Sequence, residues 1–272
     1  MTRPMHRRVS LSAISTASWD LDQDLAFYDE AGVTNAGISV AKLERFGWDE
    51  GTRRIADAGL RVTNLIGLGP FRLSEPEGWD RQRERLARAL ETAAAVGAEA
   101  VVFTTGPAGP LTWENAADAL ETALTPVLAE ARARGLPFAI EHTNSLRVDV
   151  GFVHTLRDAL DLARRLDTGV CLEINACWAE RALADTIATG IDRIRLVQVS
   201  DFAVGTLSTP NRLVPGDGDI PLDRILGQLL TAGYEGCFDL ELIGPRIEDE
   251  GYRSACRRSI DRLGEMLESL GA

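Results

Sequence analysis

The sequence predicts a single-domain α/β protein, a (β/α)8 TIM barrel that covers residues 1–272. Eight short apolar runs alternate with amphipathic stretches from end to end, and a glycine follows most of those stretches. Barrels of this class commonly reach this length as one domain. The alternative, a doubly wound sheet, predicts a glycine-rich phosphate-binding turn after the first strand, and the segment SAISTASWD contains none.

The apolar runs are rich in Val, Ile, Leu and Phe and mostly continuous, which is typical of strands buried on both faces. The expected strands are 8–14, 33–40, 61–66, 100–104, 137–141, 169–173, 194–200 and 237–242. The stretches between them place apolar residues at helical spacing. The expected helices are 21–30, 49–58, 79–96, 113–134, 153–166, 183–189, 222–232 and 249–270. Gly32, Gly59, Gly97, Gly135 and Gly233 each follow a helix, where a left-handed cap favours glycine.

Composition and charge disfavour several classes of function. A net charge of −12 argues against a nucleic-acid partner, because such proteins need basic stripes. The four cysteines have no CxxC spacing, which predicts a reduced, cytoplasmic protein without a zinc-thiolate site. We find neither a secretory signal nor an apolar stretch long enough for a membrane span. Lys42 is the sole lysine, so Schiff-base chemistry would depend on one residue and is disfavoured.

Polar residues lie at or near the carboxyl ends of four consecutive expected strands: Glu141, Glu173, Gln198 and Glu241. The carboxyl ends of barrel strands meet at one mouth, so we expect these side chains to converge there. Three converging carboxylates repel and drive one another to protonate unless a cation lies among them. Long segments at 67–78, 106–112, 144–151 and 202–219 also follow strands, as loops around a barrel active site do.

On these residues the sequence resembles the xylose isomerase-like barrels. That family includes sugar-phosphate isomerases and epimerases, inosose isomerases and dehydratases, ketose 3-epimerases and endonuclease IV relatives. The resemblance covers nearly the whole chain and is most specific at the strand ends. Its Glu, Asp, His, Glu metal quartet implies metal ligation by Glu141, Glu173, Gln198 and Glu241. In the isomerase and epimerase branches the first and last glutamates also move the substrate's proton, which implies catalytic roles for Glu141 and Glu241.

The sequence departs from the family pattern at three positions. Glu173 replaces an aspartate, Gln198 replaces a histidine, and Ala176 stands where the family often has a substrate-binding histidine. The resulting all-oxygen ligand set favours Mn²⁺ or Mg²⁺ over Zn²⁺. In the loop after strand 7, Asn211-Arg212-Leu213 stands where the endonuclease branch has an Asp-Arg-His run that binds an additional zinc, which disfavours DNA repair.

Five residues near the strand ends are candidates for substrate binding: Arg212, Trp178, Glu180, His142 and Asn64. The planar guanidinium of Arg212 suits an anionic or polyhydroxyl substrate. Its alternative is an ion pair with Asp201 or Asp217. The other four have structural alternatives: loop packing for Trp178 and Glu180, a place facing the helix layer for His142, and backbone hydrogen bonding for Asn64.

These observations predict an isomerase or epimerase that depends on Mn²⁺ or Mg²⁺. Its substrate would be a small polyhydroxy-carbonyl compound, sugar- or cyclitol-like, converted through an enediolate by glutamate acid/base residues. One alternative is a metal-dependent dehydratase or other lyase acting on a cyclic hydroxy-ketone. A second is a non-catalytic accessory barrel that binds a ligand or supports a partner. A homo-oligomer is compatible with the sequence.

Overall fold

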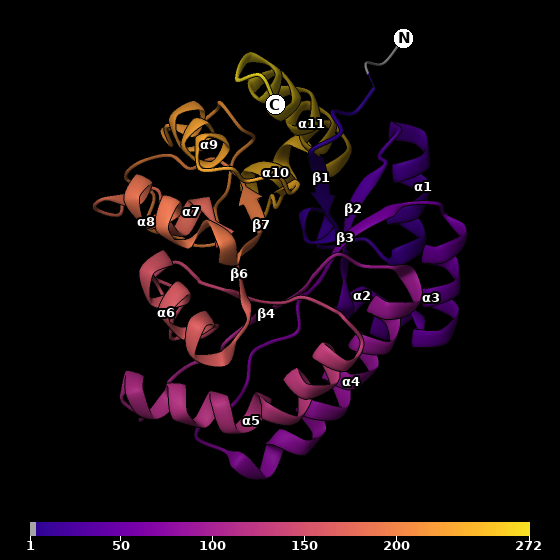
Figure 1. Ribbon diagram of the computed structural model, residues 1–272. Helices are drawn as coiled ribbons and strands as arrows, with labels where there is room; N and C mark the ends of the chain where they lie inside the picture. Colours follow the sequence, from indigo (N-terminus) through magenta and orange to yellow (C-terminus); the bar gives the residue numbers. More distant parts are fainter. Residues whose placement is uncertain (1–3) are drawn as a thin grey trace.

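Eight parallel strands form a closed barrel in chain order, which confirms the predicted fold. The computed structural model describes residues 4–272. Helices surround the strands on the outside of the barrel (Figure 1). The strands are β1 (Val9–Ser12), β2 (Asn35–Ser39), β3 (Arg61–Ile66), β4 (Val101–Thr104), β5 (Phe138–Glu141), β6 (Gly169–Glu173), β7 (Ile194–Val199) and β8 (Phe238–Leu240).

The helices follow the strands around the outside of the barrel. They are η1 (Ala13–Thr16), α1 (Leu21–Ala31), α2 (Val40–Phe46), α3 (Trp48–Asp57), η2 (Pro76–Gly78), α4 (Trp79–Val96), α5 (Trp113–Ala133), α6 (Leu156–Leu166), α7 (Ile174–Cys177), α8 (Leu183–Gly190), η3 (Ile191–Arg193), α9 (Leu222–Thr231), α10 (Pro245–Glu250) and α11 (Tyr252–Ser269). The five glycines expected to end helices all have positive φ angles. The helices α2, α7 and α10 were not expected, because each is too short to show helical spacing of apolar residues.

Two apolar layers fill the fold, and side-chain alternation along the strands separates them. The outer layer packs between strands and helices and includes Leu11, Ile38 and Phe103. The inner layer fills the barrel and consists of Ile66, Val102, Ala139, Cys171 and Leu196, with Ile14 packed against it. Because successive inward positions are two residues apart, the next inward side chains toward the carboxyl ends belong to residues 104, 141, 173 and 198.

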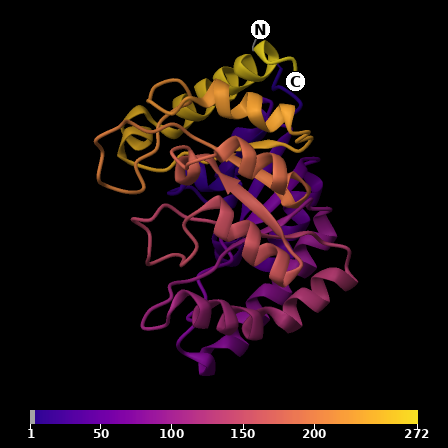
Figure 2. The same cartoon turned by 60° about the vertical axis from the view of Figure 1, so that its left-hand side comes forward.

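The long loops leave the carboxyl ends of the strands on one side of the barrel. Figure 2 shows the loops after β5 and β7 reaching out on that same side. A short isolated bridge between Asp201 and Leu213 closes the loop after β7 on itself. Within residues 4–272, no helix has the length and apolar content that crossing a bilayer requires.

Candidate active site and metal centre

A cavity of about 250 Å³ opens at the carboxyl end of the barrel. Its floor contains three glutamates and one arginine, and its walls come from the loops after β3, β5 and β7. The lining residues include Ile14, Ile66, Thr104, Glu141, Thr143, Asn144, Arg147, Glu173, Asn175, Thr209, Arg212 and Glu241. Hydroxyl, amide and guanidinium groups therefore surround a small space with carboxylates at its base.

Glu141, Glu173 and Glu241 converge at the base of this cavity. One carboxylate oxygen of each lies within 4.8 Å of the others. The side chains are almost fully buried, with exposed fractions of 8%, 2% and 5%. Each follows from its strand: Glu141 ends β5, Glu173 ends β6, and Glu241 directly follows β8. The structure thus brings together the three acids that the sequence singled out.

Arg212 reaches into this group from the loop after β7. Its Nη2 lies 2.6 Å from Glu173 Oε2 and its Nη1 lies 3.1 Å from Glu241 Oε2. Nη1 also donates a hydrogen bond to the backbone carbonyl of Glu241, at 3.1 Å. The two carboxylate contacts are ion pairs that lack hydrogen-bond alignment, since both Oε2 atoms have no hydrogen-bond partner among the described residues. The guanidinium therefore lies beside the carboxylates, and both Oε2 atoms keep hydrogen-bond capacity for another ligand.

Asp201 and Asp217, the alternative ion-pair partners of Arg212, bind other groups. Both carboxylate oxygens of Asp201 accept hydrogen bonds from backbone N–H groups in the segment 216–220, which shapes the loop after β7. Asp217 pairs with Arg258 on α11. Arg212 therefore belongs to the cavity floor.

Burial and mutual repulsion shift the pKa values of Glu141 and Glu173 upward. Burial first, and then the charges of Glu241 and Glu173, raise the pKa of Glu141 well above its usual range. Burial raises the pKa of Glu173 to about 7, although Arg212 opposes the shift. Burial alone would lower the pKa of Arg212, but Glu173 and Glu241 raise it above its ordinary range. The site therefore favours binding a positive species, either a proton or a metal cation.

Gln198 offers an independent test of whether these residues fit a cation. It is paired in register with Glu173 on β6 and with Asp239 on β8, so its side chain points into the barrel with theirs. It is completely buried, and neither Oε1 nor Nε2 has a hydrogen-bond partner among the described residues. A buried amide with no partner costs about 1–3 kcal/mol, so such a group indicates an unseen partner.

The donor set fits a hard divalent cation. Oxygens that share an ion at about 2.1 Å lie at most about 4.2 Å apart, so the glutamate oxygens need only a small closure to meet one. When ionised, three carboxylates beside one guanidinium leave two negative charges, which one divalent cation neutralises. Carboxylate and amide oxygens are ligands typical of Mg²⁺ and Mn²⁺.

His142 and Asn64 lie outside the cavity lining and contact the site from behind. His142 is buried, and its Nε2 accepts a hydrogen bond from the backbone N–H of Glu173 at 3.2 Å. Burial lowers the pKa of His142 to about 3, so the ring is neutral. Asn64 Nδ2 donates to Asp239 Oδ2 inside the barrel, at 3.1 Å, and fits there because Gly37 opposite has no side chain.

Trp178 and Glu180 also have contacts that hold the structure together. Glu180 Oε1 accepts a hydrogen bond of 2.8 Å from the backbone N–H of Leu156, the first residue of α6. Trp178 packs against the main hydrophobic core. On this side of the cavity the wall is formed by Asn175 and Ala176.

Asp239 is a buried acid that the sequence reasoning passed over. Ser10 Oγ donates to its Oδ1 at 2.6 Å, and burial raises its pKa to about 7. It precedes Glu241 by two residues and therefore points to the same interior of the barrel. An acid at an inward position of the apolar strand FDL was a readable signal. Asn175, a candidate polar contact from its place just after the sixth strand, does line the cavity, whereas Thr104 and Arg147 come from positions that carried no such signal.

Comparisons with known proteins agree with this architecture. Residues 26–263 match the family described as xylose isomerase-like TIM barrel. An inosose isomerase from Halalkalibacterium halodurans is 26% identical over 151 residues, and the match spans about half of each chain, 53% of this one and 52% of the relative.

Solved structures with a similar fold cover the whole barrel. A Sinorhizobium meliloti 1021 protein superposes with a TM-score of 0.86 at 24% identity, over 96% of this chain and 98% of that one. The IolI protein, solved with a bound zinc atom, has a TM-score of 0.81 at 18% identity, over 96% and 98%. A 3-keto-D-glucoside 4-epimerase from E. coli has a TM-score of 0.72 at 19% identity, over 96% and 99%. At these identities the superpositions show the fold alone.

Proposed function

Because the chain belongs to the xylose isomerase-like TIM barrel family, we propose that it is a divalent-metal-dependent isomerase or epimerase. Its substrate would be a small polyhydroxy-carbonyl compound, sugar- or cyclitol-like. The observation that carries this proposal is the convergence of three buried glutamates at the base of a cavity, within the described residues. The unpartnered amide of Gln198 lies beside them in register with Glu173, although it does not line the cavity. The sequence match to an inosose isomerase supports the reaction class, and a 3-keto-D-glucoside 4-epimerase shares the fold.

Glu141, Glu173, Gln198 and Glu241 would hold the cation. A bound Mn²⁺ or Mg²⁺ would supply Lewis-acid polarisation of the substrate's carbonyl and neighbouring hydroxyl. The hydroxyl, amide and guanidinium groups of Thr104, Asn175 and Arg147 would bind the remaining hydroxyls. A cavity of about 250 Å³ suits a small substrate of this kind.

Glu141 and Glu241 are proposed to move the proton. Both line the cavity and are nearly buried, so a substrate carbon can approach their carboxylates without intervening water. One glutamate removes the proton beside the carbonyl to leave an enediolate, and the other, or the same one, returns it. Arg212 holds a positive charge beside the Glu241 carboxylate, with Nη1 3.1 Å from Oε2.

Exchange with solvent deuterium tests this function. Chelator-treated protein is reloaded with Mn²⁺ and incubated in D₂O with a panel of keto-sugars and inososes. We expect metal-dependent incorporation of deuterium beside the carbonyl of at least one compound, lost in Glu241→Gln while the circular dichroism spectrum is kept. Full exchange by Glu241→Gln would refute the assigned role.

The same experiment separates the other two functions. Loss of water from the product would identify a dehydratase. Absence of stoichiometric Mn²⁺ binding, together with no exchange on any compound, would favour an accessory barrel and contradict the proposed enzyme.

A further inference from the structure

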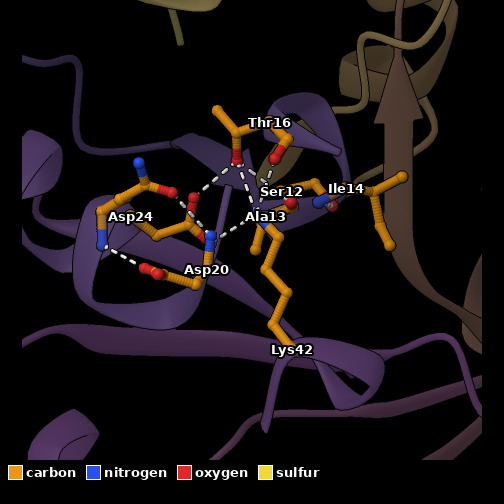
Figure 3. A network of polar contacts seen from close by, with 8 residues as sticks. Ser12, Ala13, Ile14, Thr16, Asp20, Asp24 and Lys42 are labelled. Carbon is orange, nitrogen blue, oxygen red and sulfur yellow. Dashed lines mark hydrogen bonds and ion pairs between the residues drawn. The ribbon is translucent and has the colours of Figure 1, made fainter. Parts of the chain in front are cut away.

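The sole lysine of the chain is buried behind the barrel mouth and fully paired. Lys42 Nζ donates to Asp24 Oδ2 at 2.6 Å, to Thr16 Oγ1 at 2.9 Å and to the backbone carbonyl of Thr16 at 2.8 Å. Figure 3 shows Lys42 reaching from α2 to the short helix η1 and to α1. All three ammonium protons are thus used, and two of them hold one residue, Thr16.

The Thr16 hydroxyl completes this network. It accepts a hydrogen bond from Lys42 Nζ and donates one to Asp24 Oδ1 at 2.6 Å. A buried ion pair contributes little net stability, because desolvation offsets the attraction. What this pair does accomplish is to fix η1 against α1 and α2. A planar guanidinium would not direct three donors into so compact a set of acceptors, which explains a lysine in a chain that otherwise uses arginine.

The residue next to Thr16 holds the backbone on both sides of Glu241. Ser15 Oγ donates to the carbonyl of Leu240 at 2.8 Å and accepts from the N–H of Leu242 at 2.9 Å. Ser15 is completely buried. These two bonds bracket Glu241, which lies just past the last residue of β8.

Strand geometry explains why a side chain is needed at this point. In a parallel ladder, a residue bonds to the carbonyl before and the N–H after the residue opposite it. The pairing of β1 with β8 ends at Leu11 and Leu240, because β1 turns into η1 after Ser12. The Ser15 hydroxyl, donor and acceptor at once, takes the place of the missing β1 backbone opposite Glu241. On its other side Glu241 N–H donates to the carbonyl of Val199 on β7.

We propose that Ser15 is a positioning residue for Glu241 and that the Lys42–Asp24 pair holds Ser15 in place through Thr16. This inference rests on the proposed function, in which Glu241 is a metal ligand and a proton carrier. We call the two Ser15 hydrogen bonds to Leu240 and Leu242 the clamp. The clamp would keep the Glu241 backbone rigid where the β1–β8 ladder has ended, so that the Glu241 carboxylate stays directed at the cation.

The test compares Ser15→Ala with wild type in two measurements on the full chain. Mn²⁺ binding is titrated calorimetrically after chelator treatment, and exchange of the Leu242 amide is followed by NMR without metal. We expect Ser15→Ala to weaken Mn²⁺ binding about ten-fold and to accelerate exchange of the Leu242 amide about ten-fold. Ser15→Cys is a second variant in case Ser15→Ala folds poorly. A thiol is similar in size to the hydroxyl but forms weaker hydrogen bonds, so its Mn²⁺ affinity and its Leu242 amide exchange should lie between those of wild type and Ser15→Ala.

Tyr234→Phe is the matched control. The Tyr234 hydroxyl donates to the backbone carbonyl of Cys237 at 2.6 Å, so this change removes a buried hydrogen bond at the opposite end of β8. It should lower stability without changing Mn²⁺ affinity. If Tyr234→Phe weakens Mn²⁺ binding as much as Ser15→Ala does, general loss of stability is the cause and the positioning role is refuted.

A neutral double variant, Lys42→Met with Asp24→Asn, tests the second half of the inference. It leaves Ser15 unchanged but removes the ammonium that fixes Thr16. Faster exchange of the Leu242 amide with weaker Mn²⁺ binding supports the link, and wild-type values for both overturn it.

The outcomes distinguish this inference from the proposed function. Tight Mn²⁺ binding by both wild type and Ser15→Ala overturns the clamp and leaves the metal site standing. Absence of Mn²⁺ binding by wild type itself refutes the metal site, and the clamp's role falls with it.

Discussion

Replacing Glu173 with glutamine should change how the stability of the metal-free protein depends on pH. The pKa of Glu173 is 4.5 ordinarily and about 7 in the fold, with burial as the main cause. The folded protein therefore holds a proton that the unfolded chain releases above pH 4.5. The stability that this proton contributes is present at low pH and is lost as the pH rises through 7.

The size of the effect follows from the two pKa values. Between pH 5 and pH 8 the ionisation of Glu173 should cost the folded state roughly 2–3 kcal/mol relative to the unfolded chain. A glutamine at this position does not ionise, so the stability of Glu173→Gln minus that of wild type should rise by about this amount over the same range. Glu141 adds in the same direction, because the Glu173 charge raises its pKa. Titrations elsewhere, including that of His142, cancel in the difference.

Urea denaturation in the presence of chelator, followed by circular dichroism at pH 5, 6, 7 and 8, measures this difference. The Arg212 ion pair forms only when Glu173 is ionised, so its contribution is already contained in the pKa of about 7 and in the slope that the assay follows. A difference that stays constant, or falls with rising pH, would refute the description of the site as a buried acid cluster short of a cation.

Two further substitutions separate ligands from structural residues. Gln198→Leu removes a buried amide without partners among the described residues, so we expect the metal-free protein to gain about 1 kcal/mol in stability. The Mn²⁺ affinity of this variant should fall about ten-fold. Lower stability with unchanged Mn²⁺ affinity would show that the amide has a structural partner instead. Glu180→Ala removes an acceptor from the first N–H of α6 and should cost about 1 kcal/mol in stability. It should leave Mn²⁺ affinity unchanged, and a weaker affinity, measured calorimetrically, would place Glu180 in the site.

The barrel and its main acids could be predicted from the sequence, because both follow from the regular alternation of strands and helices. All eight expected strands overlap the observed ones, since strands buried on both faces appear as continuous apolar runs. Glu141 and Glu173 end such runs, and Glu241 closely follows one, so their meeting at the mouth follows from the topology alone. Each is in a place that parallel strands bring together.

Contacts that depend on loop conformation could not be read in this way. The position of Arg212 is set by the loop after β7, which Asp201 shapes through backbone hydrogen bonds. Ser15 acts through a hydroxyl in a short helix, and its spacing from Glu241 along the chain carries no periodic signal. Glu180 is near the mouth in sequence but turns to cap α6, because an unpaired helix N–H offers it a partner.

Anomalous diffraction from a crystal soaked in Mn²⁺ tests the central claim most directly. We expect one strong peak within bonding distance of oxygens from Glu141, Glu173, Gln198 and Glu241, lost in Glu241→Gln. A map without a peak among these side chains, from protein that binds its Mn²⁺ at another place or binds none, would contradict the metal centre.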